Sequence, residues 1–123
     1  MNQDTSLHFA EYVSYGHPDR LADAVVEKIV AWAIRQNQRA LVGVEVAVHD
    51  DEVFVDGRVA GVSLNSENAT EQIDSLVRLV YQEAGYGKHW GPRPEDLKVK
   101  ISTCIEELSE EEDEIRSLSD DQN

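Results

Sequence analysis

Hydrophobic residues recur along this chain with two different periods, and each period predicts a different kind of element. Apolar residues three and four positions apart predict one helix over residues 18–36 and a second helix that begins near Asn68. A short first strand is predicted over residues 9–14. Alternation of apolar and polar residues predicts three further strands, over 41–49, 52–59 and 97–105. The predicted order is therefore β-α-β-β-α-β.

The strand at 41–49 gives the clearest indication of how these elements pack. Four valines occupy every second position and so share one face: Val42, Val44, Val46 and Val48. Each helix has a single apolar stripe, which favours an α+β fold of two layers, with both helices on one face of a mixed or antiparallel sheet. The other face is expected to be open or covered by a partner, and to carry small and charged residues: Gly43, Glu45, Ala47, Lys98 and Lys100.

Local signals add detail to this outline. Asn68, with a glutamate three residues later, is spaced like a capping box at the start of the second helix, and Gly85 suits its end. Gly57 inside a strand predicts weaker pairing, a bulge or a close approach of two backbones. Trp32 is expected in the core, and residues 88–90 (Lys-His-Trp) fit either packing of the loop against the sheet or contact with a partner.

Charge divides the chain into two parts. The net charge is −14, which argues against nucleic acid as a partner, and residues 106–123 hold nine acidic residues and one arginine. We therefore expect a domain over 1–105 and an acidic, mobile segment over 106–123. No apolar run approaches the length of a membrane span, no secretory signal is recognisable, and the single cysteine fits a reducing compartment, so we expect a cytoplasmic protein without a membrane partner.

The densest chemistry lies at the start of the first predicted helix, in Gly16-His17-Pro18-Asp19-Arg20. Proline fits the first turn of a helix, where its missing N–H costs nothing. The free N–H groups of a helix start attract phosphate, and His17 and Arg20 would strengthen that attraction. Asp19 could bring Mg²⁺, which usually arrives with phosphates. An ordinary helix start with solvated side chains would show the same residues, so both interpretations stay open on these grounds.

The same stretch resembles the opening of S-adenosylmethionine synthetases, which reads Ser-Glu-Gly-His-Pro-Asp-Lys, where this chain has Ser14 to Arg20. Three further stretches are similar in order and spacing to segments of that family: Val42-Gly43-Val44-Glu45, residues 53–58 and residues 80–86. The resemblance spans about residues 9–105, roughly an N-terminal third of a family member.

The resemblance implies a reaction and a set of roles. Enzymes of this family join ATP and methionine, assisted by Mg²⁺ and K⁺, in the metabolism of one-carbon units. It implies that His17 is catalytic and contacts the leaving triphosphate, that Asp19 binds Mg²⁺ and that Glu45 helps hold K⁺. Arg20 is a candidate for phosphate binding. The family fold contains three β-α-β-β-α-β units, and family members form oligomers with active sites between subunits.

Departures from the family pattern are equally specific. Arg58 stands where the family has a glutamate that receives the amino group of methionine, and a guanidinium would repel that ammonium group. Residues 105–110 lack the glutamine of a loop that closes over the family's site, and the remaining phosphate ligands have no counterpart here. We therefore expect no catalysis by this chain alone. A non-catalytic binding or assembly module, and a purely structural dimer domain, are the alternatives.

Overall fold

The structure is a computed structural model that describes residues 18–112, with side chains from Arg20 onward. The predicted strand at 9–14 and the side chains of His17 and Asp19 lie outside the described residues. Two α-helices, a 3₁₀ helix and four strands follow one another along the chain: α2 (Pro18–Gln36), β2 (Leu41–His49), β3 (Glu52–Ala60), α3 (Ser66–Glu83), η1 (Pro94–Asp96), β4 (Lys98–Ile101) and β5 (Cys104–Glu106). The bounds of α2 and β2 are those that the sequence pattern predicts.

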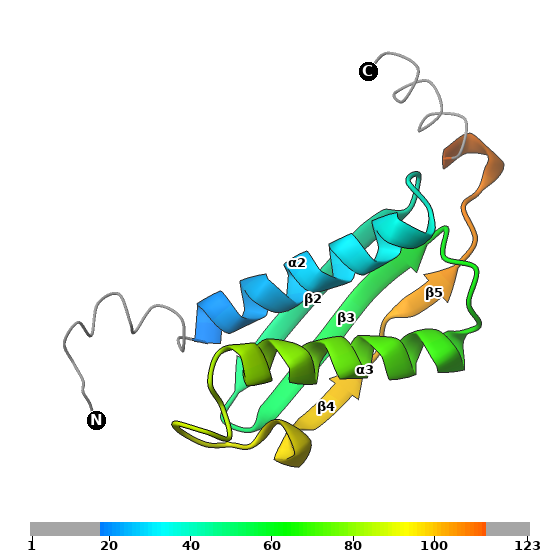
Figure 1. Ribbon diagram of the computed structural model, residues 1–123. Coiled ribbons are helices and arrows are strands. Elements are labelled where there is room, and N and C mark those ends of the chain that lie inside the picture. Colours follow the sequence, from blue (N-terminus) through cyan, green and yellow to red (C-terminus); the bar gives the residue numbers. More distant parts are fainter. Residues whose placement is uncertain (1–17, 113–123) are drawn as a thin grey trace.

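The strands form one mixed sheet, and both helices cover the same face of it (Figure 1). β3 pairs antiparallel with β2 on one side and parallel with β4 and β5 on the other. A short turn joins β2 to β3 and contains Asp50 at a φ of 55°. The predicted two-layer α+β fold is confirmed, and the sheet is of the mixed kind.

The predicted strand at 97–105 is wrong in one respect, because it is interrupted. Residues 102 and 103 separate β4 from β5, and both contact the carbonyl oxygen of Val55: the Ser102 N–H donates at 2.8 Å and the Thr103 hydroxyl at 3.4 Å. The break lies beside Gly57, which has a φ of 106° but stays paired with Val44 of β2, so only the β4 side of β3 is interrupted. The register before and after the break is the same, so the two short strands are halves of one edge.

The core lies between the sheet and the two helices. Its most deeply buried side chains come from three elements: Val25 and Ile29 of α2, Val53, Val55 and Val59 of β3, and Ile73, Val77 and Tyr81 of α3. Burying one aliphatic side chain of this size contributes roughly 1.5–3 kcal/mol. The four valines of β2 pack against this core, as predicted. Trp32 is also in the core, and its indole N–H donates to Gln72 Oε1 at 2.7 Å.

The sequence predicted the C-terminal end of α3 correctly but not its N-cap. Asn65 is the N-cap, because its side-chain oxygen accepts from the Asn68 N–H at 2.8 Å, so the predicted capping box at Asn68 is wrong. Gly85 ends the helix as predicted, at a φ of 93°. Its N–H donates to the Gln82 carbonyl and the next N–H donates to the Tyr81 carbonyl, which is a Schellman motif.

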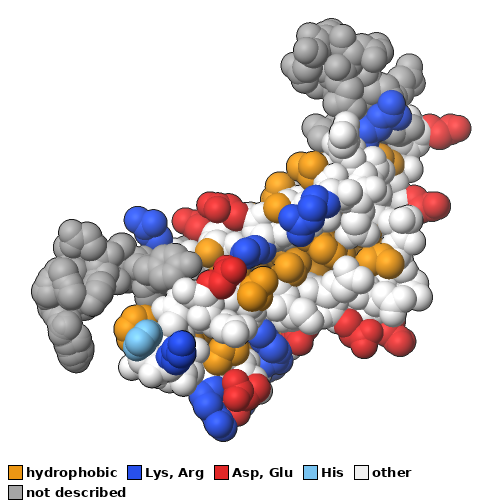
Figure 2. Space-filling model, viewed as in Figure 1, with side chains coloured by type: hydrophobic (Ala, Val, Ile, Leu, Met, Phe, Trp, Pro, Cys, Tyr) orange, Lys and Arg blue, Asp and Glu red, His pale blue; other side chains and the backbone are white. Residues whose placement is uncertain are grey.

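Apolar side chains reach the surface between the two helices (Figure 2). Figure 2 looks onto the helices and shows apolar side chains along the seam between them, with acidic and basic residues on either side. Among the described residues, no helix has the combination of length and hydropathy that a membrane crossing requires.

Candidate functional site

The candidate residues lie on two different parts of the fold. Helix α2 starts at Pro18, as expected, and Arg20 in its first turn is exposed. Glu45 lies in the middle of β2, on the face of the sheet that the helices do not cover. Because α2 packs on the opposite face, no described contact joins Arg20 to Glu45. The structure describes neither the side chain of Asp19 nor any part of His17.

Glu45 has a notable neighbour. It stands directly opposite Asp56 of β3, and both side chains are exposed. Like charges at this position in an antiparallel pair repel one another. Neither carboxylate has an ion pair with another described residue, although Asp56 Oδ1 accepts from the Gly57 N–H at 2.8 Å. Two hard oxygen donors that pair with no described cation suit a metal ion, but no group of three or more possible metal ligands occurs in residues 20–112.

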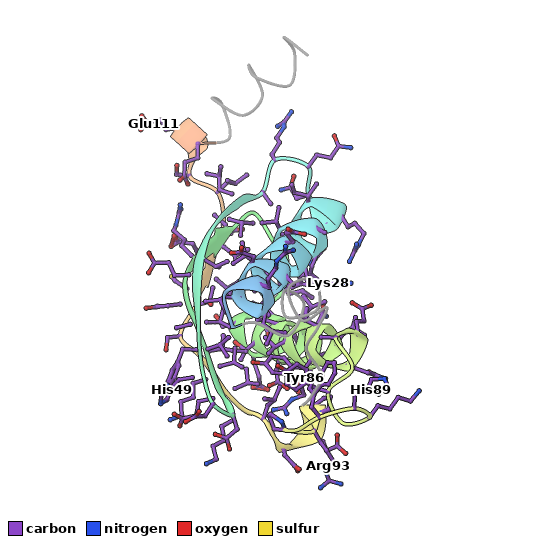
Figure 3. All side chains as sticks on the ribbon, turned by 90° about the vertical axis from the view of Figure 1, so that its left-hand side faces the viewer. Lys28, His49, Tyr86, His89, Arg93 and Glu111 are labelled. Carbon is purple, nitrogen blue, oxygen red and sulfur yellow. The ribbon has the colours of Figure 1, made fainter. Side chains whose placement is uncertain are left out.

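This uncovered face, which we call the open face, has the composition that the strand pattern predicts. Gly43, Glu45, Ala47, Lys98 and Lys100 all lie on it and are exposed. Lysine ammonium groups occupy one end: Lys98 Nζ is 3.7 Å from Asp51 Oδ2, and Lys100 Nζ is 3.5 Å from Glu52 Oε2. Lys100 also lies over the ring of Phe54, 5.4 Å from its centroid. None of the described elements covers this face (Figure 3).

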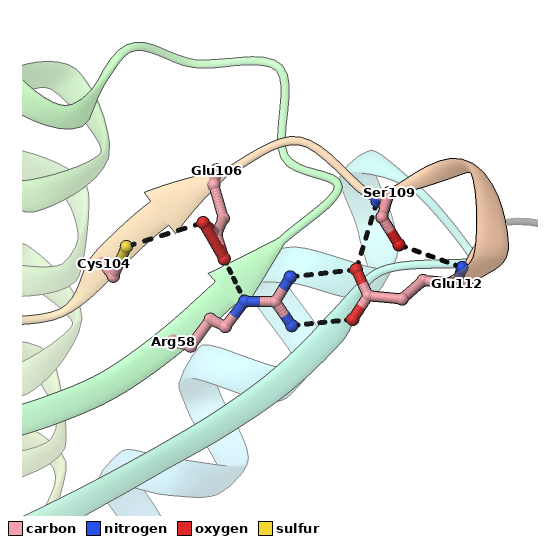
Figure 4. A network of polar contacts seen from close by, with 5 residues as sticks. All are labelled: Arg58, Cys104, Glu106, Ser109 and Glu112. Carbon is pink, nitrogen blue, oxygen red and sulfur yellow. Dashed lines mark hydrogen bonds and ion pairs between the residues drawn. The ribbon is translucent and has the colours of Figure 1, made fainter.

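The other end of the open face carries an ion-pair network that sequence reasoning missed (Figure 4). Arg58 of β3 donates through both terminal nitrogens to the Glu112 carboxylate, at 2.8 and 2.9 Å, and its Nε donates to Glu106 Oε1. The Glu112 carboxylate also accepts the Ser109 N–H at 3.1 Å, while the Glu112 N–H donates to Ser109 Oγ at 3.1 Å. We call this group, made of Arg58, Glu106, Ser109 and Glu112, the Arg58 clasp.

The Arg58 clasp shifts the ionisation of its members. Its two carboxylates raise the pKa of Arg58, and the hydrogen bonds from Arg58 lower the pKa of Glu112 to about 2. The Ser109 and Glu112 contacts are those of a reciprocal capping box. That spacing, a serine followed three residues later by a glutamate, is the signal in the sequence that would have predicted a helical turn here.

Further contacts attach residues 106–112 to the end of β3. The Gly61 N–H donates to the Glu106 carbonyl at 2.9 Å. A side chain at Gly61 would come within 3.2 Å of Leu108 Cδ1, so Leu108 lies close against the sheet end. The domain boundary at residue 105 and the mobility of 106–123 stay predictions, and residues 113–123 lie outside the described part.

The loop after α3 holds residues 88–90, where the sequence suggested loop packing or contact with a partner. Trp90 packs edge-on against Tyr86, with ring centroids 5.9 Å apart, and its carbonyl accepts the Gly87 N–H at 2.7 Å. The Trp90 side chain nevertheless stays 45% exposed. Figure 3 shows His89 and Arg93 directed outward from this end of the molecule. Trp90 therefore packs within the loop itself, while packing against the sheet and contact with a partner both stay predictions.

Comparison with known proteins supplies the observation that decides the family. Residues 5–110 match the family described as S-adenosylmethionine synthetase, N-terminal domain. This chain belongs to that family. The match covers most of the chain and includes the Gly16–Arg20 motif, Glu45 and Arg58.

Individual relatives agree with this assignment. The S-adenosylmethionine synthase of Deinococcus deserti is 32% identical over 81 residues, which are 66% of this chain and 20% of that protein. The synthase of Zymomonas mobilis is 34% identical over 80 residues, 65% of this chain and 20% of the relative. A solved structure, titled "Structure of an Unusual S-adenosylmethionine synthetase from Campylobacter jejuni", matches with a TM-score of 0.60 at 25% identity, over 78% of this chain and 25% of that one. This family member therefore spans about a fifth to a quarter of the length of the relatives it matches.

Proposed function

We propose that this chain is the N-terminal part of a cytoplasmic enzyme that forms S-adenosylmethionine from ATP and methionine. The observation that carries the proposal is the family match over residues 5–110, which includes the Gly-His-Pro-Asp motif at the start of α2. The resemblance noted in the sequence supplies the reaction. The chain spans a small part of its relatives' length, so other parts of an enzyme must provide the remaining ligands of the triphosphate.

In this proposal His17 contacts the leaving triphosphate and is the catalytic residue, because an imidazole there can stabilise the negative charge that develops on the departing oxygen. Arg20, exposed in the first turn of α2, is placed to attract phosphate. Asp19 would hold Mg²⁺ and Glu45 would hold K⁺. The position of Glu45 fits a cation, since Asp56 stands beside it and neither carboxylate is paired with a cation in the described residues. Bound Mg²⁺ would neutralise phosphate oxygens.

The Arg58 clasp bears on the second substrate. Arg58 alone would repel the ammonium group of methionine, but the guanidinium is paired with Glu106 and Glu112. The three side chains together carry a net charge of about −1, the charge of the single glutamate that the family pattern has at this position. The repulsion that the sequence suggests is therefore offset in the fold. Methionine remains the proposed substrate.

The open face supports the proposal of a homo-oligomer. Its small residues in the middle, Gly43 and Ala47, would let a second sheet approach closely, and covering it could bring cations to Glu45 and Asp56, which pair with no cation among residues 20–112. Lys98 and Lys100 lie on the same face and have the opposite charge. A second copy of the chain, packed face to face, is the proposed partner.

A second candidate function is a non-catalytic binding or assembly module that keeps the family fold. The Arg58 clasp favours it, because Glu106 and Glu112 bring acidic side chains to the end of the open face. Restoration of synthetase activity by adding a separate C-terminal part with a complete set of ligands would eliminate this candidate. Absence of any nucleotide binding by the chain would favour it.

Calorimetry with Mg²⁺ and a non-hydrolysable ATP analogue tests the first proposal. We expect His17→Ala and Asp19→Asn to weaken binding at least tenfold, since each removes a direct contact to phosphate or metal. Two matched controls, His49→Ala and Asp23→Asn, change the same residue types at exposed positions at the end of β2 and on the outer side of α2. Equal affinity for the wild type and both site variants would remove the site assignment.

A further inference from the structure

One edge of the sheet offers backbone groups that no residue in 18–112 pairs with. β4 is the outer strand on its side of the described sheet, and only one of its two sides pairs with β3. The Lys98 N–H donates to the Asp51 carbonyl at 2.9 Å and the Ser102 N–H to the Val55 carbonyl at 2.8 Å. Because alternate residues of a parallel strand point their backbone groups to opposite sides, those of Val99 and Ile101 point away from β3.

A cleft of about 430 Å³ follows this edge. Val99 and Ile101 form its floor, and the outer side of α3 forms its wall through four polar residues: Thr70, Glu71, Asp74 and Ser75. Val99 and Ile101 are half-buried, so part of each side chain is available to a molecule in the cleft. Free strand groups beside an apolar floor are the combination that a bound extended peptide uses in strand addition.

The charge in the cleft is specific. Asp74 is held by Arg78 at 3.0 and 3.1 Å, and Arg78 also donates to the carbonyls of Pro94 and Leu97. Glu71 is exposed and has no ion pair with any residue in 20–112. One negative charge on the cleft wall is therefore available to a ligand.

Sheet edges in proteins are commonly protected by lysine, and β4 carries Lys98 and Lys100. Both ammonium groups lie on the open face, where Asp51 and Glu52 hold them. The protection is thus on the side away from the cleft. The two lysines therefore do not shield Val99 and Ile101, which form the floor of the cleft.

We propose that the β4 edge and the facing side of α3 bind an extended peptide segment as an additional strand. Every second side chain of the segment faces the cleft. Of these, one is a lysine or arginine that pairs with Glu71, and the others are apolar and rest on Val99 and Ile101. The segment hydrogen-bonds to the outward backbone groups of Val99 and Ile101. This site lies apart from the open face and from the start of α2, and it does not depend on the proposed catalytic role.

The probe is a short capped peptide in which valine and threonine alternate and one valine is replaced by lysine. In an NMR titration of the full chain, we expect saturable shifts confined to residues 70–75 and 98–102, with slower amide exchange of Val99 and Ile101. Val99→Pro removes one outward N–H and no bond to β3, so it should weaken binding at least tenfold while the rest of the spectrum is kept. A peptide whose backbone nitrogens facing β4 are methylated cannot donate hydrogen bonds to β4, so it should bind the unmodified protein more weakly. It tests the same contact without a substitution in the protein.

The charge is tested separately. Glu71→Gln should weaken the lysine peptide about threefold and leave a peptide without lysine unchanged, whereas Glu67→Gln, in the first turn of the same helix, should leave both unchanged. Three results would overturn the proposal: equal binding to the Val99→Pro protein and the wild type, equal binding of the N-methylated peptide, or amides of Val99 and Ile101 that are already protected in the free chain. Shifts at the edge of β2 in place of β4 would also overturn it.

Discussion

The two faces of the same sheet are stabilised in different ways. The face under the helices consists of branched aliphatic side chains that are excluded from water, such as Val53, Val55 and Val59 of β3. On the open face of β3, Asp56 and Arg58 alternate with those valines and meet charged residues of neighbouring strands. Burial therefore accounts for most of the stability, while the open face holds the groups that can contact ligands. Substitutions matched across the two faces separate these contributions.

The largest difference is expected between two glycines in neighbouring strands. A Cβ atom at Gly57 would lie 2.1 Å from the Gly43 carbonyl oxygen, and its φ of 106° already disfavours other residues, so Gly57→Ala should cost about 3 kcal/mol or more. A Cβ at Gly43 meets nothing within 4 Å on the open face, so Gly43→Ala should stay within about 1 kcal/mol of the wild type. Urea denaturation of both variants measures this. Equal stabilities would show that the close approach of the two backbones is absent.

The next largest difference is expected between two large apolar side chains. Ile73 of α3 is fully buried, so Ile73→Ala should lower the free energy of unfolding by about 2–5 kcal/mol. Phe54 on the open face is 37% exposed, and its replacement by alanine should cost about 1 kcal/mol or less. Chemical denaturation of both variants provides the measurement. A large loss for Phe54→Ala would indicate that the open face is already covered in the protein being measured.

A smaller, local effect is expected from the Arg58 clasp. Arg58→Ala leaves Glu106 and Glu112 without their cation, so the turn at Ser109–Glu112 should detach while the core stays intact. Cleavage by a glutamate-specific protease within residues 106–112 should accelerate severalfold, and the unfolding midpoint should move less than in Ile73→Ala. Arg93→Ala is the matched control, because Arg93 is also paired with two carboxylates, Glu95 and Asp96, at the other end of the molecule. Equal cleavage of the wild type and Arg58→Ala would refute the role of the clasp.

The smallest effect concerns pH. Arg58 and Ser109 lower the pKa of Glu112 from 4.5 to about 2, so the ionised carboxylate is preferred in the folded protein. Its stabilising contribution is complete above about pH 4.5 and is lost as the pH falls towards 2. NMR titration of the Glu112 carboxyl carbon should report the low pKa in the wild type, and Arg58→Ala should return it towards its ordinary value. An unchanged titration in that variant would mean that other groups set the pKa.

The sequence predicted the elements of regular pattern more accurately than their interruptions. Val42 to Val48 alternate without a break, and β2 has the bounds that this alternation predicts. The edge formed by β4 and β5 was predicted as one strand, because the pattern of a strand cannot reveal that residues 102 and 103 leave the pairing with β3 beside Gly57. The cap of α3 was misplaced for a related reason: several polar residues precede the apolar stripe, and only the bond between Asn65 and Asn68 distinguishes them.

The candidate site could be predicted in part. Glu45 was placed on the open face from the period of its strand alone, and Arg20 follows from the start of α2. The Arg58 clasp could not be derived from the strand pattern, because it joins β3 to residues that follow β5. From the sequence alone, Arg58 looks like an isolated cation and the acidic residues of 106–123 look like solvated side chains. Their pairing depends on the tertiary fold.

The mixed pairing of β3 has a consequence for the order in which the chain assembles. β2 and β3 are joined by a short turn, so their antiparallel pairing closes a short loop, whereas β4 reaches β3 only after α3 and the following loop have formed the crossover. Loop-closure entropy favours the nearer pairing. We expect the β2–β3 hairpin with α2 to form the folding nucleus and the β4 edge to join late. This order predicts φ-values from folding kinetics that are high at Val46 and near zero at Val99. High values at Val99 together with values near zero at Val46 would contradict it.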